Sequence, residues 1–96
     1  MVLFGAALAT HAEPPKISFS GGDGSSFEKA VVIKGATEET GVKAEYAYLR
    51  EHFPGYKMGK QALVNHEKRV YDVLDFTTAD GTKTVYFDIT DFFGKF

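Results

Sequence analysis

Four aspartates near the C-terminus are the side chains whose spacing comes nearest to a chemical site. Asp72 and Asp75 fall in one predicted strand, and Asp88 and Asp91 fall in or just after the next. Carboxylates that face each other on a sheet can share a proton or bind a hard cation. With His66, the pair Asp72 and Asp88 would support a small hydrolase or a metal-dependent enzyme. Acids on strands more often keep the surface soluble and protect sheet edges, so this site is an alternative interpretation.

The glycine-rich segment at residues 21–26 (GGDGSS) has the composition of a phosphate-binding loop but lacks its defining residues. A P-loop ends in Gly-Lys-Ser/Thr and opens a helix, whereas here no lysine follows the glycines and a strand is predicted next. A calcium loop needs several acids, and this segment has only Asp23. The chain has no cysteine, and no serine lies in a G-x-S-x-G context. We therefore predict no catalytic, cofactor-binding or metal-binding residue.

Aromatic side chains form the other cluster of interest. The chain has nine Phe and five Tyr but no Trp. Aromatic residues are enriched at protein interfaces, and they form the core when they are buried. We interpret the aromatic residues of the C-terminal third as a candidate interface for a protein partner or a homodimer: Tyr71, Tyr86, Phe92, Phe93 and Phe96. Core packing is the alternative for the same side chains.

A β-hairpin must position most of these residues. Residues 69–77 and 82–90 are both rich in β-branched and aromatic side chains. Asp80-Gly81 lies between them and is a strong signal for a tight turn. The two segments therefore predict a pair of antiparallel strands.

The register of this hairpin decides which side chains share a face. A two-residue type I′ turn over the Asp-Gly dipeptide places Phe76 opposite Val85 and sets Asp72 and Asp88 on opposite faces. A turn with a glycine bulge would slip the pairing by one residue and bring Asp72 onto the face of Asp88. The first register joins more apolar surface, and we prefer it for that reason.

A helix is predicted over residues 37–53. Thr37 can cap its first turn, and two glutamates follow where the helix dipole favours negative charge. Pro54 ends the helix. Glu45 lies off the apolar stripe and is therefore expected on the solvent side. The stripe itself, with spacings of four, three and four residues, should face the sheet: Val42, Tyr46, Leu49 and Phe53.

The rest of the chain is predicted as strands. Residues 16–20 alternate polar and apolar side chains, and residues 27–34 contain a β-branched apolar run. Residues 60–65 are predicted as a strand, with a helix over residues 58–68 as the alternative. The fold class is therefore α+β, with one amphipathic helix packed on a four- to five-stranded antiparallel sheet in the order β-β-α-β-β-β. One face of such a sheet stays largely open to solvent or to a partner.

The N-terminal residues indicate export. Residues 2–9 (VLFGAALA) form an uncharged, mostly apolar run that is too short to span a bilayer, and small residues followed by Glu-Pro-Pro fit a signal-peptide cleavage site. We interpret residues 1–12 as a signal-peptide remnant and residues 13–96 as a single domain. An apolar N-terminal strand is the alternative, because no basic residue precedes the run. The predicted location is periplasmic or extracellular, and cytoplasmic if the export interpretation is wrong.

Charge and composition narrow the function further. A formal net charge of −2 offers no basic surface for nucleic acid, and no segment predicts membrane insertion. The leading interpretation is a small exported, non-enzymatic binding module that uses an open sheet face or an edge strand. A second alternative is a small-ligand carrier with a pocket between helix and sheet, lined by Tyr46, Leu49 and Phe87.

Overall fold

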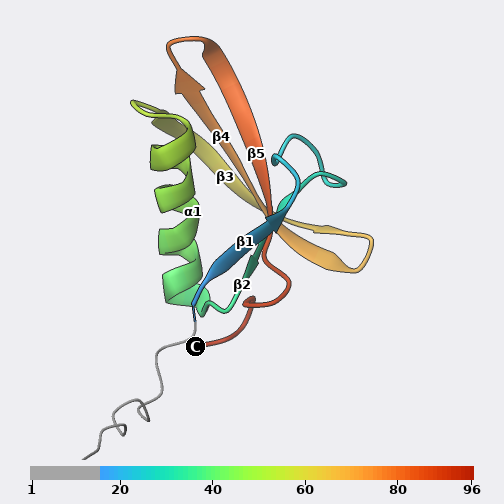
Figure 1. The fold of residues 1–96 in the computed structure, drawn as a ribbon. Coiled ribbons are helices and arrows are strands. Elements are labelled where there is room, and N and C mark those ends of the chain that lie inside the picture. The colour runs from blue at the N-terminus through green and yellow to red at the C-terminus, as the bar shows by residue number, and fades with distance from the viewer. Residues whose placement is uncertain (1–15) are drawn as a thin grey trace, which may run out of the picture.

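The computed structural model describes residues 16–96, which form one helix and a five-stranded sheet (Figure 1). The α+β class predicted from the sequence is confirmed. The elements follow the predicted order: β1 (Ser18–Gly21), β2 (Val31–Lys34), α1 (Glu38–His52), β3 (Lys57–His66), β4 (Arg69–Thr78) and β5 (Gly81–Asp88). The residues interpreted as a signal-peptide remnant, 1–12, lie outside the described part of the chain.

The strands form one sheet in the order β1-β2-β5-β4-β3. The pairs β1–β2, β5–β4 and β4–β3 are antiparallel as predicted, but β2 and β5 run parallel. The sheet is therefore mixed rather than wholly antiparallel. The reason is topological, because α1 and the β3–β4 hairpin separate β2 from β5 in the chain. A long crossover of this kind can bring the later strand back in the same direction.

α1 begins at a complete capping box. The Thr37 hydroxyl accepts a hydrogen bond from the Thr40 amide, and the Thr40 hydroxyl accepts one from the Thr37 amide. At the other end, the Phe53 amide donates to the Leu49 carbonyl, and Pro54 follows. The helix predicted from these signals is confirmed, and it lies along one face of the sheet (Figure 1).

The buried face of α1 differs from the predicted stripe by about one residue. Leu49 is buried as predicted, but Tyr46 is only half-buried, and Glu45 is buried together with Gly41. The expectation that Glu45 lies in solvent is therefore wrong. Gly41 accounts for the rotation, because a Cβ at this position would overlap the ring of Phe92. The missing side chain lets the helix approach that ring, and the residue four positions later turns toward the sheet.

The β4–β5 hairpin keeps the predicted faces in a different register. Leu74 lies opposite Val85, where the sequence predicts Phe76. The turn closes between Thr78 and Gly81, because glycine tolerates the φ of +114° at that point. A shift of two residues leaves the alternation of side chains unchanged, so each one stays on its predicted face. The slip by one residue does not occur.

Residues 57–66 form a strand, which confirms the strand interpretation of this region over the helix alternative. A two-residue turn at Glu67-Lys68 joins β3 to β4, with φ values of 49° and 67°. Positive φ at both central residues is typical of a type I′ turn, whose twist matches that of the flanking strands. β3 pairs with β4 along its length, apart from a bulge between Met58 and Lys60.

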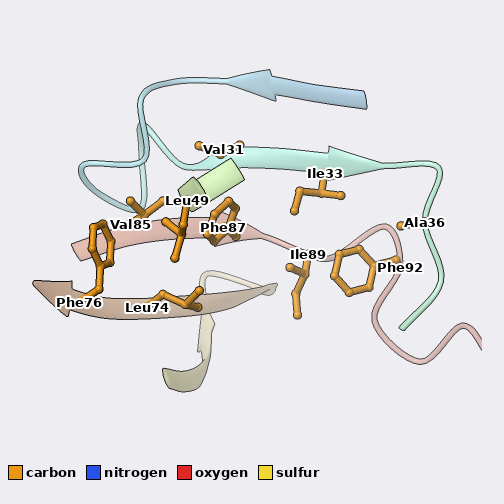
Figure 2. Packing of buried hydrophobic residues seen from close by; sticks show 10 residues of the cluster. All are labelled: Val31, Ile33, Ala36, Leu49, Leu74, Phe76, Val85, Phe87, Ile89 and Phe92. Carbon is orange, nitrogen blue, oxygen red and sulfur yellow. The ribbon is translucent and has the colours of Figure 1, made fainter. Parts of the chain in front are cut away.

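Apolar side chains from α1 and from one face of the sheet form the core (Figure 2). Strand alternation supplies most of them, because every second side chain of β2, β4 and β5 points to the helix. Edge-to-face contacts of Tyr48 with Phe87 and of Phe53 with Phe76, at 5.4 and 4.9 Å between ring centroids, join the helix to the sheet. The buried cluster consists of Val31, Ile33, Ala36, Leu49, Leu74, Phe76, Val85, Phe87, Ile89 and Phe92.

Replacing Gly41 with alanine tests the close approach of Phe92 to the helix. We expect Gly41→Ala to destabilise the fold by about 1–3 kcal/mol, because the added methyl group overlaps a buried ring, although alanine is the better helix former. Urea unfolding followed by circular dichroism measures the change. The matched control is Ala47→Gly, at an exposed position of the same helix where only helix propensity changes. A Gly41→Ala variant as stable as the wild type would contradict the packing.

Candidate functional site

The structure separates the acids that the sequence analysis groups. Asp72 lies opposite Phe87 on the face of the sheet that carries the core, and Asp88 lies on the other face. His66 is on the side of Asp88, where its ring stacks on Phe27. The side chains of Asp72, Asp88 and His66 therefore do not converge. Among residues 16–96, no three histidine, aspartate or glutamate side chains lie close enough together to hold a metal ion.

Asp88 ties the end of β5 to β4. Its carboxylate accepts a hydrogen bond from Arg69 Nε at 2.5 Å and another from the Thr90 hydroxyl at 2.6 Å. The same hydroxyl accepts a hydrogen bond from the Val70 amide at 3.0 Å, so the network spans both strands. Burial alone would raise the pKa of Asp88, but the hydrogen bonds from Arg69 and Thr90 outweigh it and hold the pKa below its ordinary value. The arrangement gives Asp88 a structural role.

The loop between β1 and β2 covers part of the face opposite α1. Phe27 from this loop stacks on His66 at 4.0 Å between ring centroids and makes edge contacts with Tyr71 and Tyr86 at 4.9 and 4.8 Å. A hydrogen bond from the Tyr86 amide to the Gly24 carbonyl, at 2.8 Å, holds the loop there. This face is therefore less open than a one-helix fold leads us to expect.

The five aromatic residues of the candidate interface lie in three different environments. Tyr71 is buried and Tyr86 is half-buried beneath the β1–β2 loop. Phe92 is buried and belongs to the core. Phe93 and Phe96 are 47% and 100% exposed. An interface through these residues stays a prediction, and its accessible part is the pair of C-terminal phenylalanines.

A buried carboxyl pair lies between α1 and the sheet. Glu45 is 0% exposed, and neither of its carboxylate oxygens makes a hydrogen bond of good geometry. Its acidic neighbour across the interface is Asp72 on β4, which is 5% exposed. Burial, followed by the nearby carboxylates of Asp72 and Glu38, raises the pKa of Glu45 to about 10. Glu45 is therefore protonated at neutral pH.

Sequence reasoning misses Glu45 because the buried face of a helix is predicted from the positions of its apolar side chains. A charged residue is almost never fully buried unless it is paired, so pattern analysis places Glu45 in solvent. The signal that was available is its spacing, four residues after Gly41 and four residues before Leu49, both of which are buried. A glycine inside a helix indicates a close approach, and the residue one turn later shares that side of the helix.

β3 forms the long open edge of the sheet. Among the described strands it pairs with β4 alone, whereas the opposite edge is the four-residue strand β1. Lysines and bulges commonly protect edge strands against strand addition. In β3 these features are Lys57, Lys60 and the bulge after Met58, all in its first half. Residues 61–65 carry no charge and no proline, and they pair with β4 without a bulge.

The side chains of this unprotected segment project to both faces of the edge. Leu63 lies on the α1 side, opposite Asp72, and is 55% exposed. No large hydrophobic side chain in the described strands is more exposed. Ala62 and Val64 lie on the other face. The edge therefore offers free backbone groups together with an apolar side chain that water still contacts.

Two surface hollows are lined by residues other than those predicted to line the pocket of a small-ligand carrier. One, of about 310 Å³, is beside the bulge at Gly59 and Lys60. The other, of about 330 Å³, lies between the C-terminal end of α1 and the β4–β5 turn. The predicted carrier pocket needs space at Leu49 and Phe87, and both side chains are fully buried in the core.

The chain matches no protein-family model, no curated protein and no solved structure. The functional interpretation therefore depends on the geometry of residues 16–96. In that part of the chain, the open edge of β3 is the feature best suited to an interaction.

Proposed function

We propose that this protein is a small non-enzymatic binding module whose β3 edge takes up an extended polypeptide segment as an additional strand. The observation that carries the proposal is the unprotected stretch at residues 61–65, on an edge where no strand of residues 16–96 lies beside it. An added strand supplies hydrogen-bond partners to the backbone groups of such an edge, and alternating side chains supply specificity.

The edge is a better binding surface than the sheet face. On the face opposite α1, Phe27 and its loop already cover Tyr71 and Tyr86. At the edge, Leu63 presents an apolar side chain that a partner strand would remove from water. Full burial of a leucine side chain is worth about 1.5–3 kcal/mol. The expected partner is therefore an uncharged extended segment with an apolar residue opposite Leu63.

Binding through β3 requires no membrane insertion. Within residues 16–96, the single helix lacks the length and hydrophobicity that a bilayer crossing needs. We propose that the interaction takes place in the periplasm or outside the cell, on the support of the apolar run at residues 2–9.

Export is tested by N-terminal sequencing of the protein after cell fractionation. If residues 1–12 are a signal-peptide remnant, the mature chain begins at Glu13 and is found outside the cytoplasm. Protein that stays in the cytoplasm with residues 2–9 still attached would contradict export. That result concerns the location of the protein and leaves the separate test of peptide binding at β3 to be decided by its own experiment.

A pH series tests the buried carboxyl pair that lies next to this edge. A carboxyl group whose pKa is raised in the folded state stabilises the fold fully below its unfolded pKa of 4.5, and this contribution is lost as the pH rises toward about 10. We expect Glu45→Gln, which removes the titration, to flatten the fall in melting temperature between pH 5 and pH 9. At pH 9 the variant should melt at a higher temperature than the wild type.

The matched control for Glu45→Gln is Glu51→Gln, because Glu51 is exposed on the same helix. Melting curves of the Glu51→Gln variant should follow those of the wild type at every pH. If the Glu45→Gln and wild-type melting temperatures run parallel across the series, Glu45 is not held protonated in the folded protein.

Binding at the β3 edge is tested with heptapeptides selected from a random library on the immobilised wild-type protein. We expect Leu63→Lys to weaken their binding about tenfold or more, because a charge on an edge strand opposes strand addition. Isothermal titration calorimetry measures the affinity. The amide shifts that the peptides cause in NMR spectra should cluster at residues 61–65.

Phe93→Lys is the matched control, because Phe93 is a similarly exposed apolar residue outside the sheet. It should leave peptide affinity unchanged, and both lysine variants should melt like the wild type. Peptides that bind the Leu63→Lys variant as tightly as the wild type would rule out the β3 edge. Loss of binding in Phe93→Lys instead would locate the interface at the C-terminal phenylalanines.

A further inference from the structure

We propose that the strand added at the β3 edge belongs to a second copy of this chain, paired antiparallel about a two-fold axis at Leu63. This inference rests on the proposed function and names the partner of the same edge. Each contact away from the axis of a two-fold dimer occurs twice, so a short self-complementary segment repeats its favourable pairs on both sides of the axis.

The uncharged stretch of β3, QALVN, matches itself when it is read in the opposite direction. An axis at Leu63 places Gln61 opposite Asn65 of the second copy, and two amide side chains can hydrogen-bond to each other. The same axis places Ala62 opposite Val64 and each Leu63 opposite its own copy. Every pair then joins side chains of one kind, amide with amide and apolar with apolar.

Neighbouring axes give poorer matches. An axis at Ala62 sets Leu63 opposite Gln61 and Lys60 opposite Val64, so that apolar side chains face polar ones. An axis one residue further along than Leu63 sets that leucine opposite an asparagine. The side-chain pattern therefore selects Leu63 as the centre.

The two faces of the sheet agree with this arrangement. Directly opposite residues of an antiparallel pair lie on the same face. Gln61, Leu63 and Asn65 are all on the α1 side, and Ala62 and Val64 are both on the other side. The paired β3 strands would join the two sheets into one continuous sheet with both helices on the same face.

The protecting features of β3 do not obstruct this register. With the axis at Leu63, the bulge between Met58 and Lys60 of one copy falls opposite the Glu67-Lys68 turn of the other, where β3 has ended. The bulge and the lysines therefore limit the length of the pairing rather than prevent it. A strand edge this short buries less than the roughly 1,200–2,000 Å² of a stable interface, so we expect a weak, reversible dimer.

The absence of cysteine from the chain makes disulfide trapping a clean test. We expect Leu63→Cys to form a cross-linked dimer under mild oxidation, because directly opposite Cα atoms lie about 4.5–5.5 Å apart, within disulfide reach. Gln61→Cys alone should stay uncrosslinked, because the two copies of this residue would be about 13 Å apart along the strands. A mixture of Gln61→Cys and Asn65→Cys proteins should form the mixed dimer.

Phe93→Cys is the control for random collision, because this residue is exposed outside the sheet. Leu63→Cys should cross-link about tenfold faster or more, because a preformed pair holds the thiols at a millimolar effective concentration. Cross-linking of Leu63→Cys no faster than this control would overturn the dimer, and so would efficient cross-linking of Gln61→Cys alone. Sedimentation equilibrium that shows only monomer at millimolar concentration would also overturn it.

The two proposals fail in different ways. If the wild type is monomeric and the selected heptapeptides still bind at residues 61–65, the edge binds strands but its partner is not a second copy. That result keeps the proposed function and overturns this inference. If peptide binding is unchanged by Leu63→Lys and Leu63→Cys also fails to cross-link, both proposals are wrong.

Discussion

The packing of one helix on one face of the sheet is the constraint on which the rest of the structure depends. α1 supplies Leu49 to a core whose other side chains come from β2, β4 and β5 and from the segments that follow β2 and β5. A helix about 10 Å wide spans only two or three strands that lie about 4.8 Å apart. β3 lies at the margin of that reach: Tyr46 of α1 still donates a hydrogen bond to Gln61, but none of the side chains of β3 is fully buried. The exposure of Leu63 at this edge follows from the limited width of α1, the helix that covers this face of the sheet.

The same packing explains the two unusual polar sites. Gly41 brings α1 close to Phe92 and turns Glu45 inward, where water cannot solvate a charge. A carboxyl group in that position is neutral at ordinary pH, so the helix can be held against Asp72 without a basic partner. Asp88, on the other face, keeps its charge because Arg69 and Thr90 supply hydrogen bonds. Glu45 of α1 and Asp88 of β5 are both buried and thus exist in opposite protonation states for local reasons.

The proposed binding edge lies beside this buried pair. Leu63 is directly opposite Asp72 in the β3–β4 register, so one strand pair connects the exposed edge to the helix–sheet interface. On the far face, Phe27 and the β1–β2 loop remove the aromatic surface that would otherwise compete as a docking site. Of the two described edges, β3 is the longer, with ten residues against four in β1.

Much of this architecture was predictable from local chemistry. The helix over residues 37–53, the strand at residues 60–65 and the faces of the last hairpin follow from capping, from periodicity and from the alternation of side chains. Binding through an edge strand stays a proposal, and the sequence could not show which strand forms the long edge, because strand order depends on contacts distant in sequence. The predicted hairpin register is wrong by two residues. The turn has Ala79-Asp80 at its centre and places Gly81, with its positive φ, at the start of the next strand, whereas the expected turn had Asp80-Gly81 at its centre.

The sequence by itself determined which segments are helix and strand and which side chains share a face, because these depend on neighbours a few positions away. The tertiary structure alone decided that β2 and β5 run parallel, that Glu45 is buried and that β3 ends the sheet. Each of these depends on which distant surfaces meet. The rotation of α1, for example, is set by Phe92, which lies beyond every strand in the chain. The local helix propensity of the residues in α1 does not depend on that contact and so could not predict it.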